Sequence, residues 1–388
     1  MKTRARRWGC RFLLSLLCVL MIAACGNPIR LRTRFDEVKI GLLAPMTGDF
    51  SSRGDPMRRA AQMAVEEVNI AGGLQVGDRR YRITLLIEDT QSTPEEAIAA
   101  ARRLLDDDVV AIIGTSASSI AIPVAEVLNQ ERMLMIAPLS SNPETTLNKR
   151  YVFRITATDD VQGKVMAEFA FYDLNAQRVA VLFQEDDVYS SFLAEVFEET
   201  YADISGNTVI AETFTAEDED VSEQLRNIQK SAADALFLPI LPQTVPRFVH
   251  QIREMGITIP LLGSDTWATI YPEDLDESYN NSYFSAAWSP TLESERSQAF
   301  EQAFTERYGL IPVTVEALTY DAFGLFFAAV QDQGSFEPKA VIKGISILES
   351  YEGVSGKATY LGHGDPIRDM IVIKIQDGEH HIYKLVEP

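Results

Sequence analysis

The sequence predicts an α/β fold of two doubly wound, Rossmann-like lobes, and three observations lead to this prediction. Short apolar runs recur along the chain and have the length of buried parallel strands. Between these runs, apolar residues are spaced three and four apart, as on one face of a helix. After its N-terminal segment the chain has about 350 residues, which exceeds the usual size of one such domain. The apolar runs lie at residues 38–43, 83–87, 109–113, 134–137, 179–183 and 235–238.

Two of the predicted helices have recognisable ends. The first carries its apolar residues over 57–68 and is followed by Gly72 and Gly73, a typical helix stop. The second carries them over 97–105 and begins at Pro94, because proline is favoured in the first helical turn. Strand and helix therefore alternate, and ligands of such sheets bind beyond the carboxyl ends of the strands. The segments after the predicted strands are 46–53, 115–119, 139–142, 157–160, 184–189 and 264–267, and they are rich in hydroxyls and carboxylates.

The first 24 residues have the layout of a signal peptide. Five basic residues lead into the apolar stretch 12–24, and no acidic residue occurs before Asp36. The stretch has about 13 residues, fewer than the roughly 20 that a membrane-spanning helix needs. Two alanines precede Cys25, which looks like the lipobox at which bacterial lipoproteins are cut and acylated. We therefore expect residues 1–24 to be removed, Cys25 to be lipidated and residues 25–36 to form a tether. The alternative is an ordinary secretory signal peptide, in which Cys25 has no particular role.

Composition argues against several classes of function. The net charge of −21 speaks against a nucleic-acid partner and implies that a lipid anchor, rather than the protein surface, holds the molecule at a membrane. Cys10, Cys18 and Cys25 are the only cysteines, so the mature chain is expected to lack disulfides and thiolate metal sites. The four histidines have no metal-ligand spacing, and no nucleophile or phosphate-binding motif is complete. We expect no catalytic residue, metal or cofactor; an enzyme reading would rest on Asp159 and Asp160 alone.

Several short segments occur in an order that is specific, although no single segment is diagnostic. They are 40–48, 64–69 with Gly72-Gly73, 88–90, Ile113-Gly114 with Ser118-Ser119, 137–143, 152–154, Gln162-Gly163, 320–322 and 353–356. In this order they resemble the bacterial type I periplasmic binding proteins of the leucine/isoleucine/valine-binding kind, and the resemblance covers residues 38–388. It implies a receptor, not an enzyme, that binds a small solute between its two lobes.

The resemblance also implies residues that hold the solute. Ser118 and Ser141 fall where the related amino-acid binders hold an α-carboxylate, and Asp159 and Asp265 where they accept from an α-ammonium. The chemistry fits, since hydroxyls and free N–H groups at helix starts bind carboxylates, although a serine in such a place can equally be an N-cap. We expect an amino acid or a related small zwitterion or amide. The predicted ligand-binding residues are Ser118, Ser119, Ser140, Ser141, Asp159, Tyr189, Asp265, Arg53 and Trp267.

Three of these residues concern the ligand side chain. Tyr189 falls at a family position whose ring packs on the ligand, and Trp267 either does the same or belongs to the core. Arg53 stands where binders of aliphatic amino acids tend to carry tyrosine, which puts an apolar side-chain pocket in doubt. Arg53 either pairs with an acidic ligand side chain or points to solvent. The identity of the ligand therefore cannot be inferred from the family.

The resemblance further implies how the chain divides and what it works with. The expected lobes are residues 37–156 with 288–352 and residues 157–287 with 353–388. The three expected crossings, which would form a three-stranded hinge, lie near residues 156–158, 286–289 and 351–353. Ligand in the cleft would favour the closed form, which the permease and ATPase subunits of an ABC importer would recognise. We expect a monomer, exported and lipid-anchored at the periplasmic or extracellular face of a membrane. The alternative is a ligand-sensing or regulatory lipoprotein with the same fold.

Overall fold

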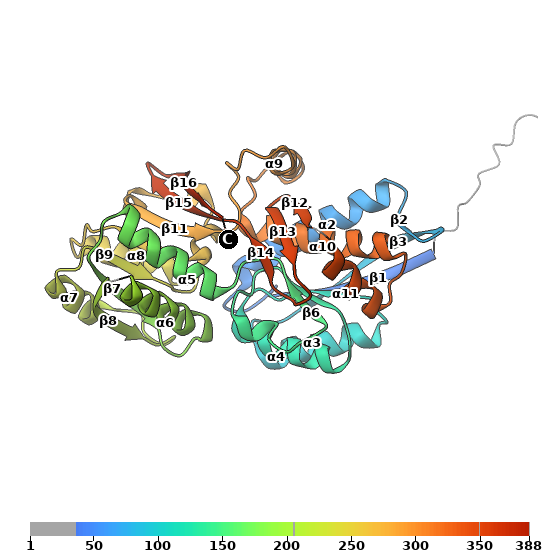
Figure 1. Cartoon of the computed structure of the whole chain (residues 1–388), viewed down its shortest axis with the longest axis horizontal. Helices are drawn as coiled ribbons and strands as arrows, with labels where there is room; N and C mark the ends of the chain where they lie inside the picture. Colours follow the sequence, from blue (N-terminus) through green and yellow to red (C-terminus); the bar gives the residue numbers. More distant parts are fainter. Residues whose placement is uncertain (1–35, 205, 349, 388) are drawn as a thin grey trace, which may run out of the picture. The chain divides into compact units, whose positions relative to one another are not determined.

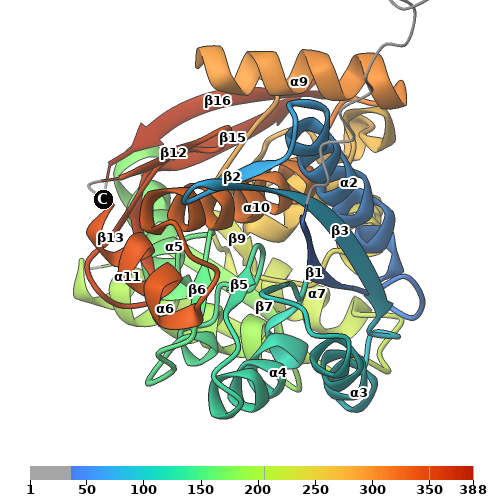
Figure 2. The ribbon, with the colours of Figure 1, turned by 90° about the vertical axis from the view of Figure 1, so that its right-hand side faces the viewer.

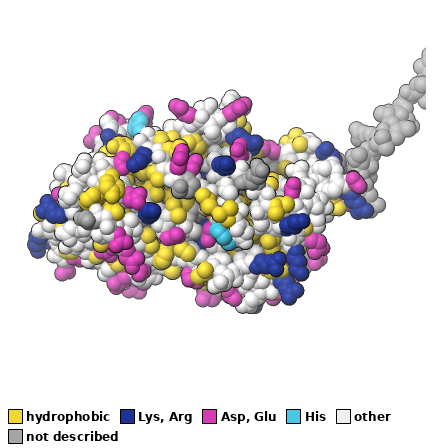
Figure 3. Space-filling model, viewed as in Figure 1, with side chains coloured by type: hydrophobic (Ala, Val, Ile, Leu, Met, Phe, Trp, Pro, Cys, Tyr) yellow, Lys and Arg dark blue, Asp and Glu magenta, His cyan; other side chains and the backbone are white. Residues whose placement is uncertain are grey.

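The computed structural model describes residues 36–204, 206–348 and 350–387, which form two lobes of sheet and helix (Figure 1). The predicted signal peptide, Cys25 and the tether up to residue 35 lie outside the described residues. The predicted α/β fold with two lobes is confirmed. Within the described part, none of the helices is both long enough and apolar enough to cross a membrane. Acidic side chains are distributed over much of the face drawn in Figure 3, in keeping with the net charge of −21.

The first lobe is built on a six-stranded sheet that is parallel except for its edge strand. In spatial order its strands are β2 (Leu74–Val76), β3 (Arg79–Asp89), β1 (Asp36–Ala44), β4 (Ile112–Ile113), β5 (Met135–Ala137) and β6 (Val152–Arg154). Only β2 runs antiparallel to its neighbour, and β1 pairs with β3 in a register that sets Val38 beside Ile83. Because successive side chains of a strand point to opposite faces, Leu42 and Leu43 join different cores.

Helices cover both faces of this sheet, as Figure 2 shows. On one face α2 (Gly54–Ile70) packs on α10 (Thr314–Gln333), and on the other α3 (Pro94–Asp106) packs on α4 (Ser118–Gln130). The predicted helix limits at Pro94 and before Gly72 are confirmed. Thr93 caps α3 by accepting a hydrogen bond from the backbone N–H of Glu96 at 3.3 Å. The remaining helices of this lobe are α9 (Glu295–Tyr308) and α11 (Pro338–Ile347).

The second lobe is built on a seven-stranded sheet. In spatial order its strands are β16 (Glu379–Val386), β15 (Met370–Gln376), β11 (Ser282–Ala286), β10 (Leu261–Gly263), β9 (Ala235–Leu238), β7 (Arg178–Gln184) and β8 (Asn207–Phe214). The strands from β11 to β8 are parallel, whereas β15 and β16 are antiparallel to their neighbours. The helices of this lobe are α5 (Asp159–Glu168), α6 (Val188–Asp203), α7 (Ser222–Ser231) and α8 (Val245–Glu254).

A third, small antiparallel sheet belongs to neither of the large ones. It consists of β12 (Tyr351–Gly353), β13 (Gly356–Tyr360) and β14 (Pro366–Arg368). Ala358 and Tyr360 are buried in the core of the first lobe, where the ring of Tyr360 packs edge-on against Phe153 at 5.9 Å. The chain joins the seven-stranded sheet only at Met370. The third crossing therefore lies between Arg368 and Met370, not near 351–353 as expected, because the small sheet buries its apolar side chains against the first lobe.

The other two connections between the lobes are also short. The first runs from the end of β6 at Arg154 to the start of α5 at Asp159. The second follows β11 and leads to Trp288, whose ring packs edge-on against Phe300 of α9. Residues 155–158 and 287–288 contain no strand, so these connections are irregular segments rather than the short strands we expected.

Candidate functional site

A pocket lies between the two lobes and contains five of the predicted ligand-binding residues. It encloses about 530 Å³ of space, including the part open to solvent. Arg53, Ser118 and Ser141 line it from the first lobe, and Tyr189 and Asp265 line it from the second. Because both lobes contribute, a ligand here touches the two halves of the molecule at once.

The first-lobe wall of the pocket is the start of α4. Ser118 is the first residue of this helix, and the preceding Ala117, in extended conformation, provides no side-chain cap. The N–H groups of the first turn are therefore not capped by a side chain, and they carry the positive end of the helix dipole. Ser118 does not act as an N-cap; its Oγ accepts from Ser140 Oγ at 3.0 Å and from the backbone N–H of Asn142 at 3.3 Å. This wall can hold a carboxylate.

Two carboxylates come from the second lobe: Asp159, which is buried, and Asp265, which is half-buried. Asp159, the first residue of α5, is fully buried; its Oδ1 accepts from Gln162 at 3.2 Å, and its Oδ2 has no partner among the described residues. Asp265 accepts from the hydroxyl of Tyr189 at 2.6 Å, and its backbone N–H donates to Gln162 Oε1, also at 2.6 Å. Burial, and next the charge of Asp265, raises the pKa of Asp159 well above its usual value. Burial also raises the pKa of Asp265. The pair is suited to a bound cation.

Arg53, just before α2, points into the pocket and not to solvent, since it is 6% exposed. One of its Nη atoms donates to the carbonyl of Ser116, and its buried Nε has no partner among the described residues. Burial lowers the pKa of Arg53, while the charges of Asp265, Tyr189 and Asp187 across the pocket act in the opposite direction. Within the described residues, no carboxylate oxygen lies within 4.0 Å of the guanidinium. Most of the N–H donors of this guanidinium are therefore available to a ligand in the pocket.

Four predicted residues lie outside the lining of the pocket, and one of them is Asp159, described above. Ser140 is buried behind Ser118, where its Oγ also bonds Thr145 Oγ1 at 2.7 Å, and Ser119 is half-buried on α4. Trp267 is fully buried in the second-lobe core, where its ring covers Gly263 so closely that a Cβ there would lie 2.4 Å from it. The prediction that Trp267 packs on the ligand is therefore corrected. The ring of Trp267 fills the space beside Gly263 in β10, where a larger residue would place a side chain.

Sequence reasoning missed several residues of the pocket. Asp187 caps α6 by accepting from the N–H groups of Tyr189 and Ser190 at 3.1 and 2.9 Å, and it also lines the pocket. Asp187 lies in segment 184–189, which follows a predicted strand. Aspartate directly before a helix is a typical N-cap, and this signal could have identified the residue. Thr314 and Leu318 come from α10, where no strand end marks them.

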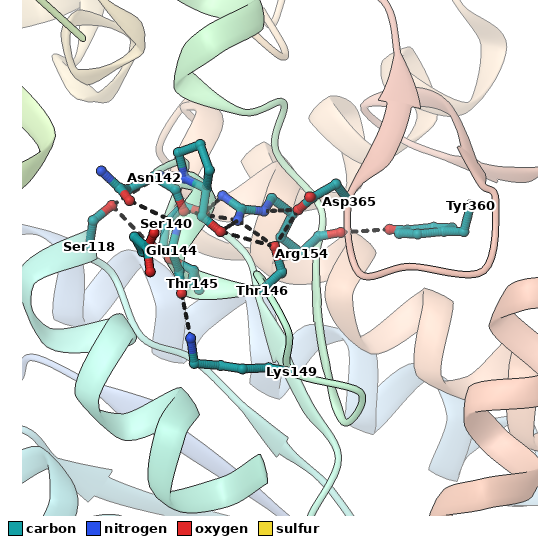
Figure 4. A network of polar contacts seen from close by, with 11 residues as sticks. Ser118, Ser140, Asn142, Glu144, Thr145, Thr146, Lys149, Arg154, Tyr360 and Asp365 are labelled. Atoms are coloured by element: carbon teal, nitrogen blue, oxygen red, sulfur yellow. Dashed lines mark hydrogen bonds and ion pairs between the residues drawn. The ribbon is translucent and has the colours of Figure 1, made fainter. Parts of the chain in front are cut away.

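A buried arginine holds the loop that carries the pocket serines. Arg154, at the end of β6, is fully buried and donates to the carbonyls of Ser140 and Asn142, both at 2.9 Å (Figure 4). Its Nε pairs with Asp365 at 2.7 Å, and its Nη2 donates to Thr146 Oγ1 at 2.8 Å. Such a planar set of donors fixes several carbonyls at once. The network therefore orients the segment that presents Ser141 to the pocket.

Comparison with known proteins agrees with this architecture. A family model described as "Periplasmic binding protein" matches residues 37–379. An amino acid binding protein of Pseudomonas aeruginosa is 32% identical over 231 residues, which span 59% of this chain and 60% of that protein. A Leu/Ile/Val-binding protein of Rhizobium johnstonii is 26% identical over 85% of this chain and 89% of its own length.

A solved structure shows the same fold over nearly the whole described chain. It is the branched-chain amino acid transporter substrate-binding protein of Streptococcus pneumoniae in complex with isoleucine. It superposes with a TM-score of 0.84 at 26% identity and covers 91% of this chain and all of that one. The family match, the fold and the inter-lobe pocket agree, and this chain belongs to the periplasmic binding protein family, whose members bind solutes.

Proposed function

We propose that this protein is the substrate-binding lipoprotein of an ABC importer and that it captures an amino acid between its lobes. One observation carries the proposal: the half-buried carboxylate of Asp265 lines the same pocket as the uncapped start of α4 with its serines, and the buried carboxylate of Asp159 lies close enough to Asp265 for that charge to raise its pKa. A zwitterion complements both ends, whereas a sugar or a simple anion would leave the carboxylates unpaired. The relatives described above carry names that refer to amino acids, which supports the same class of ligand.

The proposed position of the ligand follows from the charges. Its α-carboxylate accepts hydrogen bonds from the first turn of α4 and from the hydroxyls of Ser118 and Ser141. Its α-ammonium lies between Asp159 and Asp265, where it supplies the missing partner of Asp159 Oδ2. Tyr189, held by its hydrogen bond to Asp265, packs on the ligand from the second lobe.

Arg53 distinguishes the proposed ligand from leucine or isoleucine. A guanidinium has only donors, and a buried donor without an acceptor is costly. An aliphatic side chain would leave Arg53 unsatisfied, whereas a side chain that ends in a carboxylate or an amide would supply acceptor oxygens. We propose that the ligand is an amino acid with such a polar end, for which L-glutamate and L-glutamine are the simplest probes.

Closure links binding to transport in this proposal. Ligand contacts from both lobes favour the closed state by their differential affinity for it. A monomeric receptor, exported and held at the membrane by a lipid on Cys25, would present this closed state to permease and ATPase subunits. The acidic surface fits a protein that is kept at the membrane by its anchor and not by charge.

A calorimetric screen tests the proposed function. The chain with Cys25→Ala, exported and purified, is titrated with the twenty amino acids, with urea and with simple carboxylates. We expect at least one polar amino acid to bind at micromolar concentration or below and to raise the melting temperature by mass action. If every amino acid fails to bind while a sugar or a carboxylate without an amine binds, the proposal is wrong.

The lipid anchor is tested by the same substitution in cells. Wild-type protein should be in the membrane fraction and carry the mass of a diacylglycerol on an N-terminal Cys25. Cys25→Ala should move the protein to the soluble exported fraction, because one residue supplies the whole attachment. Cys18→Ala, in the segment expected to be removed, is the matched control and should change neither mass nor fraction. Unchanged membrane retention of Cys25→Ala would contradict lipidation at this residue.

A further inference from the structure

Arg368, the last residue of β14, lies where the three connections between the lobes meet. Its side chain is 4% exposed. Its Nη1 donates to the carbonyl of Ile155 in the first connection at 2.8 Å. Its Nη2 donates to the carbonyl of Ala287 in the second connection at 3.0 Å. The third connection begins directly after Arg368 itself, so one guanidinium contacts all three.

The same guanidinium is tied to the first lobe. Its Nη2 also donates to the carbonyl of Ser355 at 2.6 Å. The backbone N–H of Ser355 donates to Asp321 at 2.8 Å, and its hydroxyl donates to the same carboxylate. The backbone N–H of Val354 is a third donor to Asp321, also at 2.8 Å. Asp321 belongs to α10 and is 1% exposed, so the chain of contacts runs from a core helix of the first lobe to the connections.

Two of the carbonyls that Arg368 holds belong to segments that line the ligand pocket. Ala287 lines the pocket, and Ile155 directly precedes Thr156, which also lines it. An arginine can hold several carbonyls at fixed mutual distances because its donors lie in one rigid plane, whereas a lysine offers a single flexible ammonium. Arg154 adds a second link between the first connection and the small sheet. Its backbone carbonyl accepts a hydrogen bond from the hydroxyl of Tyr360 at 2.7 Å (Figure 4).

We propose that Arg368 is a positioning residue for ligand capture, which fixes the three connections relative to one another and so determines how the lobes close. The hinge movement is then restricted to the path that brings Asp159 and Asp265 onto a ligand held by the first lobe. Hinges are a few residues at the ends of elements that absorb the change in backbone angles. The inference rests on the proposed function in one respect, since closure is taken to be the step that captures an amino acid.

Distances between the lobes test this inference. Glu131→Cys on the first lobe and Glu223→Cys on the second are exposed positions, and with Cys25→Ala they leave two unique thiols in the mature chain. Spin labels on them report the inter-lobe distance distribution, without ligand and with saturating L-glutamate or L-glutamine. The test variant is Arg368→Met. Arg253→Met is the matched control, because Arg253 likewise donates to several backbone carbonyls, four in number and all of them within the second lobe.

We expect Arg368→Met to broaden the distance distribution with and without ligand. Affinity should fall about 10-fold, mainly through faster dissociation, as is typical when a coupling residue is removed. Arg253→Met should lower the melting temperature and leave both the distances and the affinity unchanged. An unchanged distribution in Arg368→Met, or equal broadening in Arg253→Met, would overturn the inference.

Two further results keep the inference separate from folding and from the proposed function. If Arg368→Met does not fold, Arg368→Lys is measured instead, since it keeps the charge but cannot hold three carbonyls; it should broaden the distribution to a smaller extent, and an unchanged distribution would overturn the inference. If no amino acid binds to the wild type, the proposed function fails. The ligand-free distances then still decide the role of Arg368.

Discussion

Asp159→Asn should lower the affinity for the amino acid ligand by about 30- to 5,000-fold, which corresponds to the roughly 2–5 kcal/mol lost when one partner of a buried charge pair is removed. The asparagine keeps the size of the side chain and removes the charge that faces the ligand ammonium. Asp265→Asn should have an effect of similar size, because its carboxylate lines the pocket directly. Titration calorimetry of both variants with the ligand found in the screen measures these losses.

Asp160→Asn is the matched control for this loss. Asp160 is the next residue of the same helix and has the same chemistry, but its side chain is exposed. Its substitution should change the affinity by less than about twofold, because an exposed charge at this distance is screened by water and salt. Equal losses in Asp159→Asn and Asp160→Asn would show that the effect comes from the helix start and not from a contact with the ligand.

The pKa of Asp159 provides a second readout of the same contact. In the ligand-free protein this pKa is raised well above 3.8, so the folded state binds a proton that the unfolded chain has lost. The contribution of Asp159 to the free energy of unfolding therefore falls as the pH rises from 3.8 through the raised value. A bound ammonium lowers the pKa again, so binding releases a proton and affinity increases with pH in that range. Calorimetry in buffers of different ionisation enthalpy should show less proton release for Asp159→Asn than for wild type.

The fold was predictable to the extent that burial leaves a local pattern. Six of the parallel strands overlap the short apolar runs named in the sequence analysis, and the helix that begins at Pro94 carries its signals within a few residues. The small sheet left no such pattern. Its strands β12 and β14 have three residues each, and whether they pack against one lobe or the other depends on the contact between Tyr360 and Phe153, which are about 200 residues apart in sequence. The third crossing was therefore misplaced.

The candidate site was predictable where its residues follow strands. Ser118, Ser141 and Asp265 lie in segments that follow strands, where ligands of such sheets bind, and the family resemblance singled them out within these segments. Thr314 comes from a helix that approaches the pocket only in the folded molecule, and no local pattern marks it. Trp267 shows the opposite error: its place beside Asp265 suggested a ligand contact, but the side chain turns into the core over Gly263.

Arg53→Met should change which amino acid the pocket prefers. In wild type the guanidinium donates to acceptor oxygens of a polar ligand side chain, and loss of hydrogen bonds to a charged group costs about 2–3 kcal/mol. Affinity for L-glutamate or L-glutamine should therefore fall about 30- to 150-fold. Affinity for L-leucine should increase, because its side chain no longer leaves a buried guanidinium without acceptors and the methionine adds apolar surface. Competition between labelled L-glutamine and unlabelled L-leucine measures the change.

Arg58→Met is the matched control for this switch. Arg58 lies on α2, the helix that begins directly after Arg53, but its side chain is 35% exposed and pairs with Asp55 at the surface. Removing it should leave the preference unchanged, since surface ion pairs contribute little and this one is outside the pocket. If wild type already binds L-leucine more tightly than L-glutamate and L-glutamine, and Arg53→Met keeps that order, then Arg53 does not select the ligand. Its charge would then serve only to attract Asp187 and Asp265 of the second lobe across the pocket, a contribution to closure that would not depend on which amino acid is bound.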